Sequence, residues 1–352
     1  MTSLREQAMQ AHPDFPWLEA GDAAGIERLL SRLGWLAAGE RISSADPAGE
    51  GNMNLTLRIV SDRRSFVLKQ ARPWVEKYPE IAAPWDRSEV EQRFYARIAS
   101  LPEVASRMPR VIACSSENRL IALEDLRDAR DLTSLYSGDD FGDDELDSLA
   151  DYLAALHGGT LGDPDPAFAN RAMRALDHEH IFRVPLDPAN GLDLDRHEPG
   201  LRTAALALIA DREFTARAET LGQIYLADGR QLVHGDCFPG SWLRTRDGLR
   251  LIDPEFSHFG AAEFDLGCAV AHLALAQKTA AAAQRLIERH RAHGHAPKLD
   301  PALIAGFAAI EVVRRLIGVA QLPLPPSRDV RRALLARARK AMLDSRHEVL
   351  FA

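Results

Sequence analysis

The spacing of apolar residues changes near Leu126, and this change constrains the fold more than any other feature of the chain. Leu55, Leu57 and Ile59 alternate with polar neighbours, and a second apolar run, Phe66–Leu68, follows after a polar turn, as expected for a β-hairpin. Beyond Leu126, long stretches such as "DELDSLADYLAALHGG" and "ALIAGFAAIEVVRRLIGVA" have helical spacing instead. Strands grouped in one part of the chain and helices in the other indicate the α+β class rather than a doubly wound sheet.

The chain of 352 residues is long enough for two packed lobes. The change of pattern predicts a strand-rich lobe over residues 1–126 and a helical lobe over residues 127–352. Asp86 and Glu89 stand three residues apart at the start of a helical stretch, which predicts an N-cap with a capping box. Residues 163–200 are rich in Pro and Asp and are expected to form a long irregular insertion, whose role stays open.

The composition argues against several classes of function. A net charge of −8 is unlike a general nucleic-acid binder, because such proteins are usually basic. The longest apolar run, "CAVAHLALA", is too short to span a bilayer, and the first twenty residues lack the apolar core of a signal peptide. The three cysteines are too few and too scattered for a disulfide framework. We therefore expect a globular protein of a reducing cytoplasm, with no nucleic-acid partner and no membrane partner.

One segment, "LVHGDCFPGSWLRTRDGLRLIDPEF" at residues 232–256, gathers most of the candidate chemistry. Asp236 follows one apolar pair and Asp253 ends another apolar run, so the two acids converge if their strands pair. One carboxylate is suited to orient and deprotonate a hydroxyl, and the other to hold Mg²⁺, a cation that prefers oxygen ligands. Glu255 and Ser241 are the further candidate ligands. A polar hairpin with ordinary surface charges is the alternative at this point.

The segment resembles the catalytic hairpin of the aminoglycoside phosphotransferase and choline kinase group, which shares the protein-kinase-like fold. The resemblance implies a bilobal fold with ATP between the lobes, Asp236 as the catalytic base and Asp253 as a Mg²⁺ ligand. We further expect His234 to orient the loop and Asp265, in "EFDLG", to cap it. Ser241 stands at the position of that group's asparagine.

Other segments narrow the resemblance to the 5-methylthioribose kinases. They are "GEGNMNLTLRI", "LKQARPWVEKYP", "ALEDL", "FDLG" and "EVVRRLIGVA", scattered from Gly49 to Ala320. The resemblance implies roles for Gly51, Asn52, Asn54 and Lys69 at the nucleotide phosphates, for the backbone of Glu124 and Leu126 at the adenine, and for Arg314 and Arg315 at the substrate or the transferring phosphate. Lys69 is also expected to pair with a helix glutamate, for which Glu91 is favoured over Glu89.

Ordinary structural explanations compete with these assignments. A lysine at a strand end, such as Lys69, is usually a surface charge, and a Gly-x-Gly before a strand is more often a turn. The segment with Arg314 and Arg315 also suits an apolar helix face with one arginine extending its charged end to solvent. Residues 124–126 equally suit a plain strand-to-loop transition, and Cys237 is expected to be packed.

The function expected from these residues and from the resemblance is transfer of the γ-phosphoryl group of ATP to a hydroxyl of a small molecule, with Mg²⁺ as the metal. The resemblance implies 5-methylthioribose as the acceptor. The alternatives are a kinase of another small alcohol, amino alcohol or aminoglycoside, and a catalytically silent nucleotide-binding protein. A metal-dependent hydrolase is less favoured, because the segment has one histidine and no second one at ligand spacing. Homodimer formation stays open.

Overall fold

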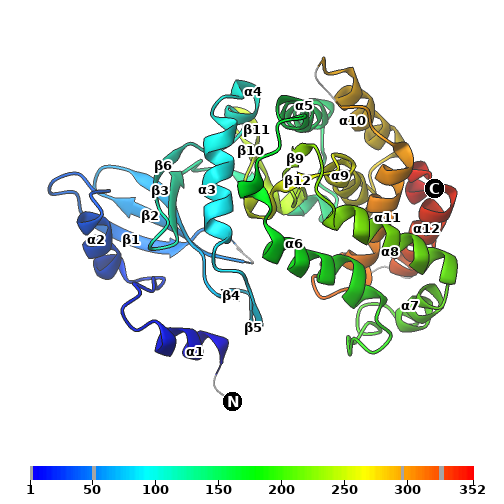
Figure 1. Ribbon diagram of the computed structural model, residues 1–352, viewed down its shortest axis with the longest axis horizontal. Helices are drawn as coiled ribbons and strands as arrows, with labels where there is room; N and C mark the ends of the chain where they lie inside the picture. Colours follow the sequence, from blue (N-terminus) through cyan, green and yellow to red (C-terminus); the bar gives the residue numbers. More distant parts are fainter. Residues whose placement is uncertain (1–2, 50–52, 295–296, 325–328) are drawn as a thin grey trace. The chain divides into compact units, whose positions relative to one another are not determined.

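The structure, a computed structural model, describes residues 3–49, 53–294, 297–324 and 329–352. Gly51 and Asn52, both predicted to bind nucleotide phosphates, lie outside the described residues. The chain divides into two compact units, Met1–Ser100 with Met108–Asp128 and Leu101–Arg107 with Ala129–Ala352. Figure 1 shows the helices and strands of both units, with labels on all of those named below except β7 and β8.

The first unit is built on a sheet with the strand order β1-β2-β3-β7-β6. Its elements are α1 (Leu4–Ala11), α2 (Ala23–Arg32), β1 (Ile42–Pro47), β2 (Leu55–Ser61), β3 (Ser65–Gln70), β4 (Trp74–Val75), β5 (Tyr78–Ala82), α3 (Arg87–Ile98), β6 (Val111–Ser115) and β7 (Leu120–Glu124). The predicted hairpin is confirmed, because β2 and β3 pair antiparallel. Leu57, Ile59 and Leu68 of this hairpin form one buried apolar cluster with Ile26 and Leu30 of α2.

Helix α3 begins differently from the prediction. The side chain of Asp86 makes no capping hydrogen bond, so the predicted capping box with Glu89 is wrong. Glu89 instead forms ion pairs with Arg93, one turn further along the helix, and with Arg119. The fully buried Arg87 donates hydrogen bonds to three backbone carbonyls of neighbouring loops. A backbone-bonded arginine thus holds the start of this helix in place of the predicted cap.

The second unit is mainly helical. Its helices are α4 (Pro102–Ala105), α5 (Asp143–Gly159), α6 (Arg171–His178), α7 (Leu201–Ile209), α8 (Arg212–Leu226), α9 (Glu263–Leu275), α10 (Ala280–Ala292), α11 (Pro301–Ile317) and α12 (Val330–Asp344). Helices α9 and α11 pack along each other and are buried over most of their length, so they form the centre of this unit's core. A strand-rich first unit and a helical second unit confirm the predicted α+β class.

The short strands of the second unit place the two candidate acids. They are β8 (Arg130–Asp131), β9 (Gln231–Val233), β10 (Trp242–Thr245), β11 (Gly248–Leu251) and β12 (His258–Gly260). Strand β9 pairs with β12, whereas β11 pairs with β10. The strands before Asp236 and Asp253 therefore do not pair with each other, so the condition under which the two acids were expected to converge is not met. The two loops are joined instead by His234, whose Nε2 lies 3.0 Å from the carbonyl oxygen of Ile252.

Part of the segment 163–200 is helical, which corrects the prediction of an irregular insertion. Helix α6 continues directly into a π-helical turn, Glu179–Arg183. The helix buries Met173, Arg174 and Asp177 on one side. Flanking prolines and aspartates hide this short amphipathic pattern in the sequence, because they dominate the composition of the segment.

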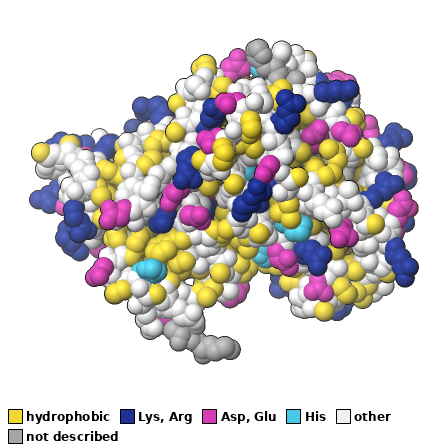
Figure 2. Space-filling model, viewed as in Figure 1, with side chains coloured by type: hydrophobic (Ala, Val, Ile, Leu, Met, Phe, Trp, Pro, Cys, Tyr) yellow, Lys and Arg dark blue, Asp and Glu magenta, His cyan; other side chains and the backbone are white. Residues whose placement is uncertain are grey.

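The surface carries charges of both signs. On the face seen in Figure 2, acidic and basic side chains are interspersed rather than gathered into one basic patch. Across the part of the chain that the structure describes, none of the helices has the length and apolarity that a bilayer crossing needs.

Candidate active site

Asp236 is placed by a tight turn that follows β9. Gly235, the residue before it, has a φ of +85°, in the left-handed region that favours glycine. A Cβ atom on Gly235 would lie 2.5 Å from the backbone oxygen of Phe256, so a larger residue does not fit. The turn leaves the side chain of Asp236 partly exposed, at 22%.

The fully buried carboxylate of Asp265 on α9 holds this turn in place through hydrogen bonds. It accepts the backbone N–H of His234 at 2.7 Å and that of Gly235 at 3.0 Å, and it contacts Nε2 of His157 at 3.0 Å. Burial acts to raise the pKa of Asp265, but the hydrogen bond from His157 and the other donors outweigh it and lower the pKa. The prediction that Asp265 caps the loop is confirmed by this geometry.

The side chain of His234 fixes the orientation of the loop. Its Nδ1 accepts the backbone N–H of Asp236 at 3.4 Å, and its Nε2 faces the carbonyl of Ile252. A carbonyl only accepts, so Nε2 is the donor in the contact with Ile252. His234 is fully buried and therefore orients the loop rather than carrying protons, as predicted. Cys237 is also fully buried, and its Sγ accepts from the indole N–H of Trp242.

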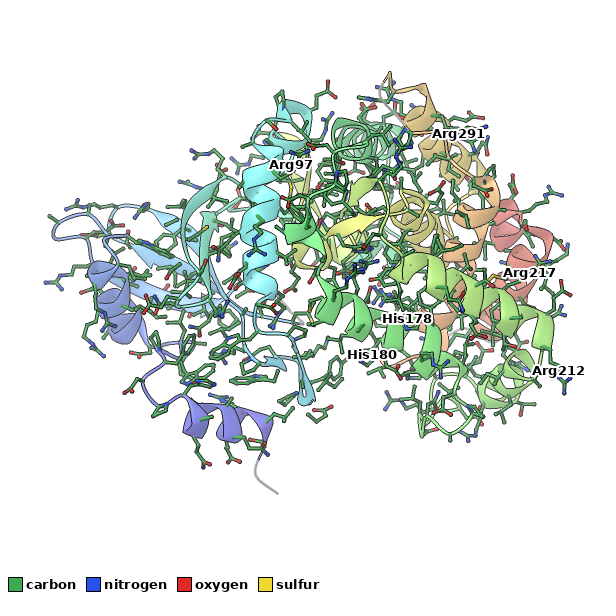
Figure 3. All side chains as sticks on the ribbon, viewed as in Figure 1. Arg97, His178, His180, Arg212, Arg217 and Arg291 are labelled. Carbon is green, nitrogen blue, oxygen red and sulfur yellow. The ribbon has the colours of Figure 1, made fainter. Side chains whose placement is uncertain are left out.

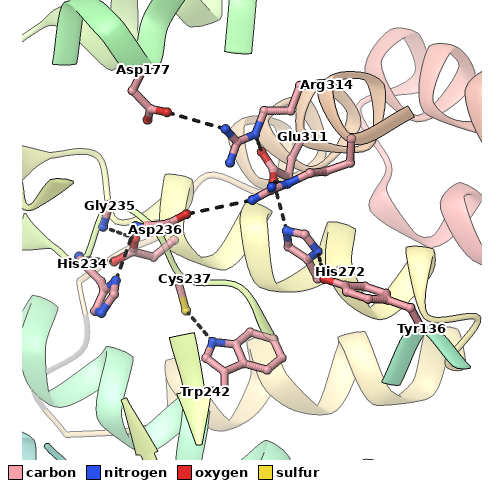
Figure 4. Close-up of polar contacts among 12 residues, drawn as sticks. Tyr136, Asp177, His234, Gly235, Asp236, Cys237, Trp242, His272, Glu311 and Arg314 are labelled. Carbon is pink, nitrogen blue, oxygen red and sulfur yellow. Dashed lines mark hydrogen bonds and ion pairs between the residues drawn. The ribbon is translucent and has the colours of Figure 1, made fainter. Parts of the chain in front are cut away.

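An arginine pair in the last turn of α11 lies beside Asp236 (Figure 4). Arg314 and Arg315 each donate from Nε to Glu311, at 2.5 Å and 2.8 Å. The Nη2 of Arg315 lies 4.0 Å from Oδ1 of Asp236, and its guanidinium lies 4.8 Å from the ring centre of Phe238. Burial acts to raise the pKa of Glu311, but the two guanidinium groups outweigh it and lower the pKa. The structure thus brings the predicted substrate-binding arginines together with the predicted base.

The largest influence on the pKa of Asp236 is the loss of hydration on burial. Burial raises the pKa of Asp236 to about 7, although Arg315 and Arg314 both favour the charged form. A carboxyl group with a pKa near neutrality is suited to accept a proton from a hydroxyl at that pH.

Residues that the sequence did not single out complete this side of the site. The Nε2 of His272 lies 3.0 Å from Glu311, and its Nδ1 lies 2.7 Å from the hydroxyl of Tyr136. Burial lowers the pKa of His272 to about 4, so the ring is neutral and links Tyr136 to Glu311. Glu311 was detectable in the sequence, because it stands three and four residues before the arginine pair, the spacing that brings helix side chains together. Nothing in the sequence marked His272 or Tyr136.

The candidate metal ligands lie on the next loop. Asp253 has a φ of +65°, and Glu255 is buried in the 3₁₀ turn Pro254–Phe256 that follows it. The backbone oxygen of Ser241 accepts the N–H of Ile252 at 3.1 Å, which ties this loop to the one carrying Asp236. The described residues hold no cluster of three or more His, Cys, Asp or Glu side chains arranged around a cation position. Mg²⁺ bound with phosphates needs only one or two carboxylates, so Asp253 and Glu255 fit that ion.

The first unit contains the predicted lysine–glutamate pair. The Nζ of Lys69 on β3 lies 2.7 Å and 2.9 Å from the two carboxylate oxygens of Glu91 on α3, and both residues are buried. Glu89 pairs with Arg119 instead, so the choice of Glu91 over Glu89 is confirmed. Asn54 is buried and accepts a hydrogen bond from Arg87.

The predicted adenine-binding segment ends β7. The backbone N–H of Glu124 donates to the carbonyl of Arg110 at 2.8 Å, and the carboxylate of Glu124 pairs with the guanidinium of the same arginine. Leu126 follows in the loop after the strand. These contacts hold the strand end, and a role for Glu124 and Leu126 in binding adenine stays a prediction.

Comparisons with known proteins place this arrangement in a family. The sequence model of the "Phosphotransferase enzyme family" matches residues 44–302. Among curated proteins, the chain is similar to a methylthioribose kinase of Exiguobacterium sibiricum, with 26% identity over 70% of this chain and 64% of the relative. It is similar to the same enzyme of Bacillus pumilus, with 27% identity and the same coverage of both chains. The chain therefore spans about 64% of the length of the curated relatives it matches.

Solved structures agree on the fold. A spectinomycin phosphotransferase in complex with ADP and spectinomycin has a TM-score of 0.53 and 14% identity, with 95% of this chain and 98% of that chain aligned. At this identity the likeness concerns the fold alone, and it confirms the protein-kinase-like class predicted from the sequence. Because the family model covers most of the chain, from the first sheet to the start of α11, the protein belongs to the phosphotransferase enzyme family.

Proposed function

We propose that the protein is a kinase that transfers the γ-phosphoryl group of ATP to a hydroxyl of a small molecule, with 5-methylthioribose as the first acceptor to test. The family supports phosphoryl transfer, and the names of the curated relatives support the acceptor. The observation that carries the proposal is the position of Asp236, a carboxylate with a pKa of about 7 on a braced turn, beside the guanidinium of Arg315.

In the proposed reaction Asp236 aligns the acceptor hydroxyl and takes its proton. The hydroxyl oxygen forms the new bond to the γ-phosphorus, and the bond from that phosphorus to the bridging oxygen breaks, which releases ADP. Such catalysis is mostly positioning and charge stabilisation. The guanidinium of Arg315 stabilises negative charge on the transferring group, because it is always charged and donates in a planar fork.

The remaining residues hold the nucleotide and its metal. Lys69, oriented by Glu91, positions the phosphates of ATP. Asp253, Glu255 and Ser241 are the proposed ligands of Mg²⁺, which neutralises phosphate charge when bound. The presence of both the lysine–glutamate pair and the acids argues for an active enzyme, since a silent nucleotide-binding protein has no chemical need for all of them.

A kinase of a small amino alcohol is the second candidate, and one observation favours it. Three carboxylates, those of Asp177, Asp236 and Glu311, surround the two guanidinium groups of Arg314 and Arg315. The local charge of these side chains is therefore −1 when all are ionised (two positive and three negative groups). The charge of the arginine pair alone therefore does not exclude a cationic acceptor.

An acceptor panel tests the proposal. ATP consumption with Mg²⁺ is measured for 5-methylthioribose, ribose, choline and an aminoglycoside at equal concentrations. We expect 5-methylthioribose to be consumed at least as well as ribose and far better than either cation. Preference for choline or the aminoglycoside would establish the second candidate, and ATP consumption that depends on none of the acceptors would overturn the kinase assignment.

We place the reaction in the cytoplasm. The three cysteines are free thiols, and two of them, Cys237 and Cys268, are buried. Burial raises the pKa of both thiols well above its usual range, which keeps them unreactive. Free thiols suit a reducing compartment.

A further inference from the structure

The segment 163–200 contributes one buried carboxylate to the surroundings of the arginine pair. Asp177, near the end of α6, lies with its Oδ1 3.6 Å from Nη1 of Arg314 (Figure 4). Its Oδ2 accepts a hydrogen bond of 2.7 Å from the hydroxyl of Tyr225, a buried residue of α8. Helix α6 then continues into the π-helical turn that carries His180, which Figure 3 labels together with His178. Such turns are rare in proteins and are often found at functional sites.

The two arginines are held firmly on one side only. Both use Nε to bind Glu311, at 2.5 Å and 2.8 Å. Their terminal nitrogens lie 3.6 Å from Asp177 and 4.0 Å from Asp236, which is longer than a hydrogen bond. Among the described residues the structure records no hydrogen bond from the Nη atoms of Arg314 or Arg315. Glu311 therefore directs two sets of N–H donors toward two different carboxylates, each just beyond hydrogen-bond distance.

The opposite charges of Asp177 and Arg314 together favour a neutral hydroxyl as a binding partner. A hydroxyl group donates one hydrogen bond and accepts others, so it satisfies a guanidinium N–H and a carboxylate oxygen at once. An ammonium group at the same place meets Arg314, and an anion meets Asp177, so each is repelled by one member of the pair. Two adjacent hydroxyls of a sugar match a carboxylate and a guanidinium that already face each other.

We infer that Asp177 and Arg314 form a recognition pair for the non-reacting hydroxyls of a neutral sugar acceptor, whereas Asp236 and Arg315 serve the hydroxyl that is phosphorylated. This inference rests on the proposed function and divides its arginine pair into two tasks. It also gives the segment 163–200 a role, because α6 supplies the acid that determines acceptor choice. An asparagine side chain keeps an oxygen that accepts the hydrogen bond from Tyr225 and has nearly the same size, so Asp177→Asn removes the charge while keeping that contact.

The test compares Asp177→Asn with Asp193→Asn, an exposed aspartate of the same segment. Kinetics are measured with the best acceptor of the wild-type protein and with forms of that acceptor that lack one non-reacting hydroxyl. Loss of a hydrogen bond to a charged group weakens binding by about ten- to a hundredfold. We expect Asp177→Asn to raise the KM for the acceptor by about that factor and to leave the KM for ATP unchanged. Asp193→Asn should change neither value.

The deoxy acceptors separate recognition from mere support of the fold. In the wild-type protein, removing the hydroxyl bound by Asp177 should raise the acceptor KM, and in Asp177→Asn the same removal should have little further effect. Equal sensitivity of both proteins to every deoxy acceptor would overturn the inference, and so would a rise in the KM for ATP equal to that for the acceptor. If wild-type protein phosphorylates a neutral sugar other than 5-methylthioribose, the acceptor identity fails but the comparison still decides the role of Asp177. Preference for a cationic acceptor would overturn the inference. If wild-type protein phosphorylates none, both proposals fail.

Discussion

The carboxylate of Asp265 accepts the backbone N–H of Gly235 at 3.0 Å and so holds the turn directly before Asp236. Asp265→Asn should lower the free energy of unfolding by about 1.5–3 kcal/mol, because an amide cannot accept from His234, Gly235 and His157 together. It should also lower kcat, since the turn carries the proposed base. Urea unfolding of this variant and of Asp247→Asn, an exposed turn residue of the same unit, measures the difference.

The same carboxylate predicts how stability depends on pH. The pKa of Asp265 is lowered in the folded protein, so its contribution is present above the unfolded value of about 3.9 and is lost as the pH falls further. The stability difference between wild type and Asp265→Asn should therefore shrink as the pH drops below about 4. A difference that stays constant from pH 7 to the acid limit would contradict the buried, ionised state of Asp265.

The pair of Lys69 and Glu91 predicts a specific effect on nucleotide binding. Glu91→Gln removes the charge that orients Lys69 and should raise the KM for ATP by about ten- to a hundredfold. Glu89→Gln is the matched control on the same helix, because Glu89 pairs with Arg119 and should leave the KM for ATP nearly unchanged. Steady-state kinetics with varied ATP give the KM for both variants. Equal changes of this KM in the two variants would contradict the role of Lys69 in ATP binding.

Asp253 predicts the metal dependence. Asp253→Asn should abolish Mg²⁺-dependent turnover, because a neutral amide is a poor replacement for a carboxylate ligand. The fold should survive, since asparagine tolerates the left-handed backbone that Asp253 adopts at φ +65°. Turnover is measured over a series of Mg²⁺ concentrations. A variant that reaches half-maximal turnover at the wild-type Mg²⁺ concentration would show that Asp253 is no metal ligand.

The pKa of Asp236 predicts the pH profile. The ionised form is the base, so kcat/KM for ATP, which reports the free enzyme, should fall as the pH drops through about 7. Arg315 lowers the pKa of Asp236, and removing its charge in Arg315→Met should therefore move the midpoint to higher pH. An unchanged midpoint in Arg315→Met would show that the charge of this arginine does not act on the titrating group.

Local sequence patterns predicted the hairpin of β2 and β3, the long helices and the identity of the acids, because each of these depends on neighbouring residues. The resemblance to a known family predicted how these segments come together in space. The pairing of β9 with β12 could not be predicted, since both strands are only three residues long and give too little of a pattern to identify a partner. The capping box at Asp86 was wrong because tertiary contacts of Arg87 replaced a local motif.

The residues of the candidate site also divide into those that a local pattern marks in the sequence and those that it does not. Asp236, Asp253 and the arginine pair stand in recognisable segments, whereas Asp177 comes from a segment whose composition resembles a loop. Its contact with Arg314 joins residues that are 137 positions apart in the sequence (314 minus 177), and periodicity carries no information over such a distance. Glu311 was not singled out in the sequence, but it could have been, because its helical spacing to both arginines can be read from the sequence.

The most direct test of the account is product analysis with the wild-type protein and Asp236→Asn. With ATP, Mg²⁺ and 5-methylthioribose, wild-type protein should form one phosphorylated acceptor for each ADP released. Asp236→Asn should bind ATP normally and unfold at a temperature no lower than wild type at pH 8, because the amide removes a carboxylate whose ionisation is disfavoured in the folded state. Its kcat should be lower by at least about a hundredfold, the smallest factor expected for a general base. Equal amounts of phosphorylated acceptor from both proteins, or ADP release without phosphorylated acceptor, would contradict phosphoryl transfer at Asp236.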